Sequence, residues 1–304
     1  MTRTGVIYNP RSRRNRAAAA PAVAPEGLLV EAPDNREALD EALSHFAQAG
    51  VELLVVDGGD GTVREVLTRA PTHFYARLPT LAVLPSGKTN ALALDLGAPR
   101  DWTLENALKS AADGHIVERR PLEVFRPGAT RPLVRCFLLG AGAFVRGTDL
   151  AQRAHKMGAF EGLAVGLTLG AAGIQTLFGG ARSGWRSGEP MSLRFPDETT
   201  LEGDIFLLLA SSLHRLPLGV RPFGKAMEGV RTLAVEAPPR RLVRALAPML
   251  AGRDRPWLVE AGYHRRAVEE LAVKLETSFV LDGETFPGGE LTIRAGEPLA
   301  FVRP

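Results

Sequence analysis

The stretch of the chain best suited to bind a ligand and act on it is Val55-Val56-Asp57-Gly58-Gly59-Asp60-Gly61-Thr62, in which Asp60 lies between glycines. Apolar residues within Glu52–Val56 predict a buried strand before the glycines, and helical spacing of apolar residues predicts a helix over Thr62–Ala70. Glycine has no Cβ, so a ligand can approach the main chain closely. Free N–H groups at a helix start, together with the helix dipole, favour a phosphate. The pattern also fits an ordinary tight turn, but an acid between glycines at the carboxyl end of a strand indicates a phosphate site.

Two further stretches carry groups that could act on a phosphate or beside one. The segment Pro85-Ser86-Gly87-Lys88-Thr89-Asn90 follows a predicted strand at Thr80–Leu84 and contributes a lysine, which could pair with a phosphate. The segment Leu281-Asp282-Gly283-Glu284 follows a predicted strand at Phe279–Leu281. Its two carboxylates alternate on an extended chain, so both could face one cleft only if the intervening glycine bends it. The other reading of this pair is an exposed hairpin end.

Strands alternate with helices from the start of the chain to about residue 120. Strands are predicted at Gly5–Tyr8 and Leu28–Glu31, before the glycine turn. One helix is predicted after Asp34, which forms a capping-box pattern with Glu37, and another after Asp101. This alternation predicts a parallel, doubly wound α/β sheet.

Beyond Pro121 the pattern changes to short strands separated by turns. The predicted strands are Leu133–Leu139, Ser192–Phe195, Ile205–Ala210, Val230–Val235, Leu271–Glu276, Phe279–Leu281 and Leu291–Arg294. They predict an antiparallel β-sandwich. We therefore expect an α/β domain over residues 1–121 and a β-sandwich domain over residues 122–304, whose last strand could return to the first domain.

The segment Gly162–Ala181 contains no charged residue. Its length would allow a membrane span, but its many glycines and moderate hydrophobicity favour a buried or cleft-lining helix. Such a helix beside a phosphate site would suit a lipid substrate, although core packing explains it equally well.

The composition is that of a globular protein with a mild positive charge. The 304 residues include 37 Lys and Arg against 34 Asp and Glu, a formal net charge of +3. No aromatic residues interleave with the arginines of residues 11–16, so we expect no nucleic-acid partner. The single cysteine, Cys136, excludes an intrachain disulfide and is typical of a reducing compartment. With no secretory apolar region at the start, we expect a cytoplasmic protein.

Four segments, in this order, resemble the diacylglycerol kinase-like lipid kinases, a family that includes bacterial lipid kinases and sphingosine kinases. They are Asn9-Pro10-Arg11-Ser12, the Gly58–Thr62 turn with Glu65 after it, Leu84–Asn90, and Leu281–Glu284. The glycine turn is shared with NAD kinases and phosphofructokinases, whereas the first and last segments point to the lipid branch. The resemblance implies ATP and Mg²⁺ in a cleft between an α/β domain and a β-sandwich. It also implies a lipid substrate, a role in phospholipid metabolism and peripheral contact with the inner membrane face.

Residue by residue, the resemblance implies one ATP site and one acceptor site. The ATP site would contain Asn9, Gly58, Gly59, Asp60, Gly61, Thr62, Glu65, Gly87, Lys88, Thr89 and Asn90. Asp60 would also join the magnesium and phosphate network. Asp282 and Glu284 would face the lipid hydroxyl, with Glu284 as general base.

The chain departs from the family pattern at several places, one of them Ala91-Leu92, which replaces a frequent Asp-Phe. Arg13 stands where the family usually has glycine, Lys88 lies in place of part of its Gly-Thr-x-Asn motif, and Glu228 lies where it has a magnesium-binding aspartate. Glu228 is therefore a second metal candidate beside Asp60. Two alternatives stay open: an NAD kinase, although its Asn-Glu pair is not found, and a nucleotide- or lipid-binding regulatory protein without turnover. A homodimer through an exposed sheet edge of the second domain is a further expectation.

Overall fold

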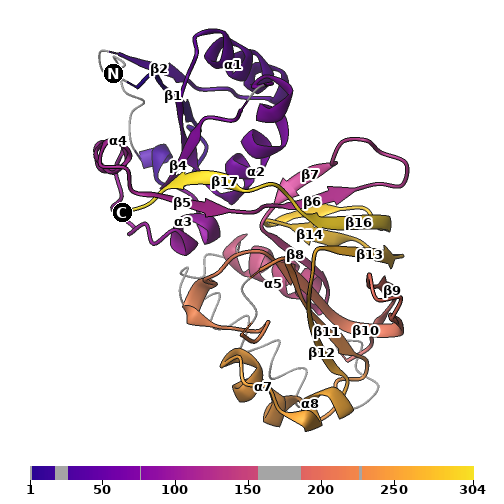
Figure 1. Ribbon diagram of the computed structural model, residues 1–304. Coiled ribbons are helices and arrows are strands. Elements are labelled where there is room, and N and C mark those ends of the chain that lie inside the picture. Colours follow the sequence, from indigo (N-terminus) through magenta and orange to yellow (C-terminus); the bar gives the residue numbers. More distant parts are fainter. Residues whose placement is uncertain (1, 18–26, 76, 157–185, 226–227) are drawn as a thin grey trace.

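The computed structural model describes residues 2–17, 27–75, 77–156, 186–225 and 228–304, with the backbone alone for residues 150–156. Within these residues the strands form two sheets, one of six strands and one of eleven. Figure 1 shows the first sheet with helices α1 to α4 at one end of the molecule and the second sheet extending from it toward α7 and α8. The apolar helix predicted at Gly162–Ala181 lies outside the described residues.

The six-stranded sheet has the order β2-β1-β3-β4-β17-β5. Its strands are β1 (Thr4–Tyr8), β2 (Leu28–Glu31), β3 (Leu53–Gly58), β4 (Thr80–Pro85), β5 (Ile116–Arg119) and β17 (Leu299–Val302). Strands β1 to β4 are parallel to one another, β17 is parallel to β4, and β5 is antiparallel to β17. The last strand of the chain thus pairs inside the sheet that the first 120 residues build.

Helices cover both faces of this sheet, as the predicted doubly wound architecture requires. They are α1 (Arg36–Gln48), α2 (Asp60–Arg69), α3 (Ala91–Asp95) and α4 (Leu104–Ala112), with the 3₁₀ turns η1 (Asn15–Ala17) and η2 (Ala70–Thr72). Because side chains alternate along a strand, Leu54 and Val56 of β3 pack with α1 and α2, whereas Leu53 and Val55 pack with α4. Burial on both faces explains why β3 is a continuous apolar run.

The helix caps differ from those predicted. The cap of α1 is Asn35, whose side chain accepts a hydrogen bond from the Ala38 N–H at 2.8 Å, and Asp34 lies one residue outside. The cap of α4 is Thr103, which forms a reciprocal capping box with Asn106, so Asp101 is not the cap. In both cases a second polar residue near the predicted cap satisfies the free N–H groups of the first turn.

The eleven-stranded sheet is antiparallel. Its strands are β6 (Leu122–Phe125), β7 (Val134–Cys136), β8 (Leu138–Gly142), β9 (Glu189–Arg194), β10 (Thr200–Ser211), β11 (Val230–Glu236), β12 (Tyr263–Val268), β13 (Glu270–Leu275), β14 (Phe279–Leu281), β15 (Glu284–Phe286) and β16 (Gly289–Ala295). The first half of β10 pairs with β9 and its second half with β8, and its pairing with β11 has a register shift between Ile205 and Leu207. This shared strand bends the sheet around its own apolar core, which gives the sandwich-like form predicted from the sequence.

Helices α5 (Ala143–Lys156), α7 (Leu242–Leu250) and α8 (Pro256–Glu260), with the turn η3 (Pro217–Gly219), complete the described elements. Among the described residues, no helix combines the length and the apolar character needed to cross a membrane. Strands β5 and β6, which lie on either side of Pro121, belong to different sheets. The domain limits 1–121 and 122–304 stay a prediction.

The single strand predicted over Leu133–Leu139 is wrong. The structure divides it into β7 and β8 at Phe137, because the carboxylate of Asp282 accepts hydrogen bonds from the N–H groups of Phe137 and Leu138. The break therefore has a tertiary cause: a side chain from a distant turn takes donors that a continuous strand would use in its ladder.

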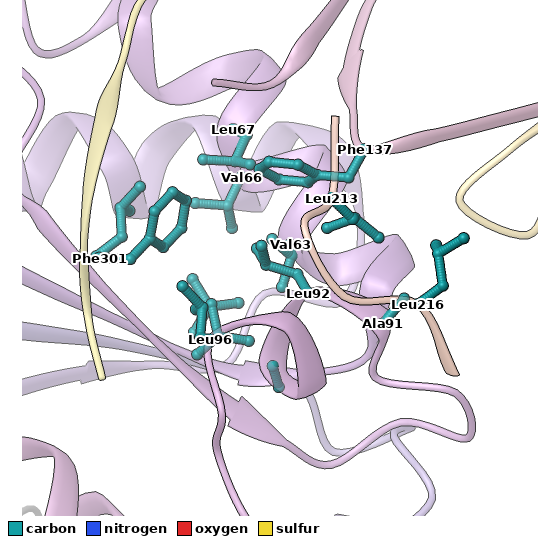
Figure 2. Close-up of a cluster of buried hydrophobic side chains, with 14 of the residues drawn as sticks. Val63, Val66, Leu67, Ala91, Leu92, Leu96, Phe137, Leu213, Leu216 and Phe301 are labelled. Atoms are coloured by element: carbon teal, nitrogen blue, oxygen red, sulfur yellow. The ribbon is translucent and has the colours of Figure 1, made fainter. Parts of the chain in front are cut away.

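An apolar cluster joins the two sheets. Val63, Val66 and Leu67 of α2 pack in one buried cluster with Phe137, which connects β7 to β8, and with Phe301 of β17. Figure 2 shows these side chains together with residues of α3 and with Leu213 and Leu216 from the segment after β10. The helix that follows the glycine turn is thus fixed against the second sheet by its apolar face.

Candidate functional site

The glycine turn has the predicted strand–turn–helix geometry. Strand β3 ends at Gly58, Gly59 is the N-cap of α2 with no side-chain cap, and Asp60 is the first helical residue. The N–H groups of a first helical turn have no acceptors within the helix. A glycine cap leaves them accessible to a ligand, which is the arrangement that binds phosphate.

Glycine is required where this turn meets the loop after β4. A Cβ on Gly87 would lie 2.5 Å from the Cα of Gly59, and a Cβ on Gly59 would lie 3.0 Å from the Cα of Gly87. The two main chains therefore touch. The left-handed residue Asn90 closes the second loop, since its side chain accepts from Gly87 N–H at 2.8 Å and donates to Gly87 C=O at 3.1 Å.

The turn borders a cavity of about 800 Å³. Of the predicted ATP-site residues, those that line it are Asn9, Gly59, Gly61, Thr62, Glu65, Gly87 and Lys88. Asn9 donates a hydrogen bond to the Thr62 hydroxyl at 2.7 Å, so the segment after β1 holds the start of α2. The cavity wall also includes Glu284, whereas Gly58, Asp60, Thr89, Asn90 and Asp282 are not part of it.

The cavity wall is rich in cations. Arg11, Arg13, Arg16, Arg36 and Lys88 line it, against the acids Asp34, Glu65 and Glu284. Two departures from the family pattern, at residues 13 and 88, thus add positive charge to the wall. That charge suits a polyanionic ligand.

Asp60 is directed toward the start of α3. Its carboxylate accepts a long hydrogen bond, 3.4 Å, from the N–H of Leu92. Burial raises the pKa of Asp60. Main-chain hydrogen bonds from Leu92, Ala91 and Asn90 lower this pKa, but they offset only part of the rise. A buried carboxylate of this kind is stabilised by a nearby cation.

Asp282 lies in the left-handed region, with φ of 43°, between β14 and β15. Its Oδ1 accepts a hydrogen bond from the Leu138 N–H at 2.9 Å, and its Oδ2 accepts one from the Phe137 N–H at 3.1 Å. Burial, and next the charge of Asp60, raise the pKa of Asp282 to about 7. The carboxylate is therefore fixed in position and able to exchange a proton near neutral pH.

Glu284 follows the left-handed Gly283 and approaches the glycine turn. A Cβ on Gly61 would lie 3.9 Å from Glu284 Oε1. The other oxygen, Oε2, lies 2.5 Å from a guanidinium nitrogen of Arg64, a side chain of α2 with no exposed surface. The acidic turn of the second sheet and the glycine turn of the first thus meet, as the sequence predicted.

Arg64 connects the two turns through several contacts. Its guanidinium donates to the Leu281 C=O and to Glu65, both at 3.1 Å, and lies over the ring of Phe286 with 5.6 Å to the centroid. Glu65 also accepts two hydrogen bonds from Arg36 at 3.2 Å. Burial alone would raise the pKa of Glu65, but the hydrogen bonds and charges of Arg36 and Arg64 outweigh it and lower the pKa.

Sequence reasoning missed Arg64 and Arg36. Arg64 occupies a position on the otherwise apolar face of α2, between Val63 and Val66, and a charge at such a position is the signal that could have indicated a buried partner. Arg36 is the first residue of α1, and no local pattern connects it with Glu65.

The described residues contain no group of three or more His, Cys, Asp or Glu that could hold a metal by itself. Glu228 is exposed in the bend before β11 and does not line the cavity, so its metal role stays a prediction. Mg²⁺ is commonly held by one or two carboxylates together with substrate phosphates. Asp60 directly precedes Gly61 in the sequence, and Glu284 Oε1 would lie 3.9 Å from a Cβ on Gly61, so these two carboxylates fit that more limited requirement.

Comparisons with known proteins agree with this geometry. Residues 3–124 match the diacylglycerol kinase catalytic domain. The chain is 36% identical over 95 residues to "Probable lipid kinase YegS" of Escherichia fergusonii, and 33% identical over 90 residues to "Probable lipid kinase YegS-like" of Enterobacter sp. (strain 638). These stretches cover 31% and 29% of this chain, and the same shares of the relatives. The match of residues 3–124 to the diacylglycerol kinase catalytic domain agrees with the family that the motifs resemble, and the chain aligns with less than a third of the length of these relatives.

The fold similarity extends over the whole chain. A diacylglycerol kinase from Bacillus anthracis superposes with a TM-score of 0.63 at 15% identity, covering 99% of this chain and 97% of that one. A second chain from the same organism gives a TM-score of 0.69 at 17% identity with the same coverage. The predicted fold class, an α/β domain followed by an antiparallel sandwich, is thus confirmed.

Proposed function

We propose that this protein is an ATP-dependent lipid kinase that transfers the γ-phosphoryl group of ATP to a lipid hydroxyl, as on diacylglycerol or a related lipid. The observation that carries the proposal is the approach of Glu284 to Gly61, which brings the acidic turn of the second sheet to the rim of a cavity large enough for a nucleotide. Phosphoryl transfer needs this combination of phosphate binding and a positioned carboxylate.

The nucleotide phosphates would lie against the N–H groups of the Gly59–Thr62 turn. Lys88 and the arginines of the cavity wall would neutralise the remaining charge. Mg²⁺, which Asp60 and Glu284 would help to hold, supplies further charge neutralisation on the transferred group.

We infer that Asp282, rather than the predicted Glu284, is the general base. The Glu284 carboxylate lies 2.5 Å from the guanidinium of Arg64, so this ion pair holds it on α2. Asp282, whose pKa is raised to about 7, is in the range that suits a base at neutral pH. Its carboxylate would accept the proton of the lipid hydroxyl. The hydroxyl oxygen would bond to the γ-phosphorus while the bond from phosphorus to the β–γ bridging oxygen breaks and ADP leaves.

The lipid substrate implies peripheral contact with the inner face of a membrane from a cytoplasmic location. That contact rests on the resemblance to lipid kinases, whereas the proposed homodimer rests on the exposed sheet edge expected in the second domain.

The acceptor can be identified by incubating purified protein with ATP, Mg²⁺ and separate pools of diacylglycerol, sphingosine and total lipid extract. We expect ADP release that depends on one lipid pool, and a product heavier than that lipid by one HPO₃ unit in the mass spectrum. NADP formation from NAD would instead support the NAD kinase alternative. Tight ATP binding with no phosphorylated product would support a regulatory protein.

A further inference from the structure

The surface of α7 and α8 carries the longest run of exposed apolar side chains next to clustered arginines in the described part of the chain. On α7, Val243, Leu246 and Leu250 are 65%, 41% and 45% exposed, although all three are apolar. On α8, Val259 is 60% exposed. Exposed apolar residues that cluster, rather than occur singly, indicate an interaction surface.

The exposed residues of α7 form one stripe. Val243, Leu246 and Leu250 follow the i, i+3, i+7 spacing that places side chains on one helix face. The opposite face, with Ala245 and Met249, is buried in the apolar cluster that continues to α2 and α3. The helix therefore has two apolar faces, and the protein core uses only one of them.

Arginines surround this stripe. Arg240, Arg241, Arg244, Arg253 and Arg255 are all exposed, against two acids, Asp254 and Glu260, in the same segment of residues 240–260. Asp254 is paired with Arg265 at 2.9 Å, so it does not neutralise these five arginines, which form a rim around the stripe. Arg244 lies over the ring of Trp257 at 5.0 Å, which directs its charge along the helix pair.

We propose that the stripe and its arginine rim dock on an anionic phospholipid bilayer, with the apolar side chains in the headgroup boundary and the arginines on lipid phosphates. A two-fold dimer through the same stripe would bring identical arginine rims together, which opposes self-association. An apolar centre does not fit a nucleic-acid backbone, which is bound by charge. In Figure 1, α7 and α8 form the end of the molecule farthest from α1 and β2, so the bilayer would contact the second-sheet half of the chain.

This proposal deepens the proposed function, because it names the surface by which a lipid kinase would reach its substrate. Co-sedimentation with vesicles of phosphatidylcholine alone, or with phosphatidylglycerol added, tests it without ATP or turnover. We expect binding only to the phosphatidylglycerol vesicles, and weaker binding at higher salt.

Two triple variants separate charge from apolar contact. Arg240→Gln/Arg244→Gln/Arg253→Gln should weaken vesicle binding roughly 100-fold, at about fivefold per arginine. Val243→Ser/Leu246→Ser/Leu250→Ser should weaken it at least about tenfold, since the buried apolar area drives insertion. The matched controls Arg100→Gln/Arg194→Gln/Arg303→Gln and Tyr75→Ser/Leu133→Ser change exposed residues elsewhere and should bind like the wild type.

Circular dichroism and thermal unfolding establish that each variant folds. Wild-type binding by both triple variants would overturn the proposal. A wild-type dimer in light scattering that the serine variant converts to a monomer would assign the stripe to a second copy instead. Vesicle binding without any kinase activity would leave this surface standing and reject the proposed function. Normal turnover on a water-dispersed short-chain lipid, with no vesicle binding by the wild type, would support the proposed function and reject the membrane-docking surface.

Discussion

Arg64, on the helix after the glycine turn, lies 2.5 Å from Glu284, the first residue of β15, and has no exposed side-chain surface. The two residues are 220 positions apart in the sequence: Arg64 lies on α2, which follows a strand of the six-stranded sheet, and Glu284 lies in the eleven-stranded sheet. The pair, with the Arg64 hydrogen bond to Leu281 C=O, holds the acidic turn against the glycine turn. The position of Asp282 depends on this connection, because Asp282 lies between Leu281 and Glu284.

Arg64→Met should remove that connection. We expect a loss of about 2–4 kcal/mol in the free energy of unfolding, since buried acceptors lose a charged donor while Glu284, 56% exposed, can turn to water. The turnover number should fall more than the affinity for ATP, because the acceptor turn is displaced and the glycine turn is not. Steady-state kinetics, with denaturant unfolding, measures both.

Arg64→Lys is the matched variant, because it keeps the charge but not the forked geometry. It should recover part of the stability and less of the turnover. Equal recovery of both would mean that Arg64 contributes charge alone and does not position the turn.

Asp282→Asn should remove the general base while its side-chain oxygen can still accept a main-chain hydrogen bond. We expect kcat/KM to fall by about 10²–10⁴. In the wild type, kcat/KM should rise with pH through about 7, where Asp282 loses its proton, and then level off. A pH profile measured for both proteins, with Glu284→Gln as comparison, assigns the base. Persistence of the wild-type rise in Asp282→Asn would give that role to another group.

The same carboxylate predicts a pH dependence of stability. Its pKa in the folded state, about 7, lies above the ordinary value of 3.8, so the folded protein holds a proton that the unfolded chain releases between those values. Its contribution to stability is therefore present at low pH and is lost as the pH rises toward 7. The stability of Asp282→Asn minus that of the wild type should therefore be larger at pH 8 than at pH 5. Thermal unfolding of both proteins at the two pH values measures this difference. A difference that does not change with pH would contradict the assignment.

Gly87→Ala tests the contact between the two phosphate-side loops. Its Cβ would lie 2.5 Å from the Cα of Gly59, so the loops must separate, at a cost of about 1–3 kcal/mol. ATP affinity by calorimetry should weaken together with stability. Gly147→Ala is the control, since a Cβ there meets nothing within 4 Å and the residue is helical. It should leave ATP affinity unchanged, and an equal effect of both substitutions would show that the contact is not specific.

Lys88→Met tests whether the departures from the family pattern serve the nucleotide. Loss of a cation on the cavity wall should raise the Kd for ATP about tenfold and that for adenosine hardly at all, because adenosine carries no phosphate. Stronger ATP binding by the variant would mean that Lys88 obstructs the site instead.

The local parts of the site could be predicted from the sequence, because each depends on a few adjacent residues. The strand, glycine turn and helix from Leu53 to Arg69 follow from burial pattern and the absence of Cβ atoms. The sequence predicts the return of β17 to the first sheet only as one possibility, because no local pattern in Leu299–Val302 specifies that β17 pairs with β4 and β5.

The parts that could not be predicted depend on pairs of residues far apart in the chain. Arg64 with Glu284, Arg36 with Glu65, and Asp282 with the main chain at Phe137 each join segments that no spacing relates. The last of these also ended a strand that apolar pattern alone predicted as continuous. The sequence placed the acidic turn near the glycine turn by resemblance, whereas the contacts that hold it there became visible only in the fold.

The most direct test of the account is whether radiolabelled γ-phosphate moves from ATP into a lipid in the presence of folded protein and Mg²⁺. We predict label in an organic-phase lipid with the wild type, increasing with pH through about 7, and at least about 100-fold less with Asp282→Asn. Folded wild-type protein that binds ATP but labels no lipid from a complete extract would contradict the central claim.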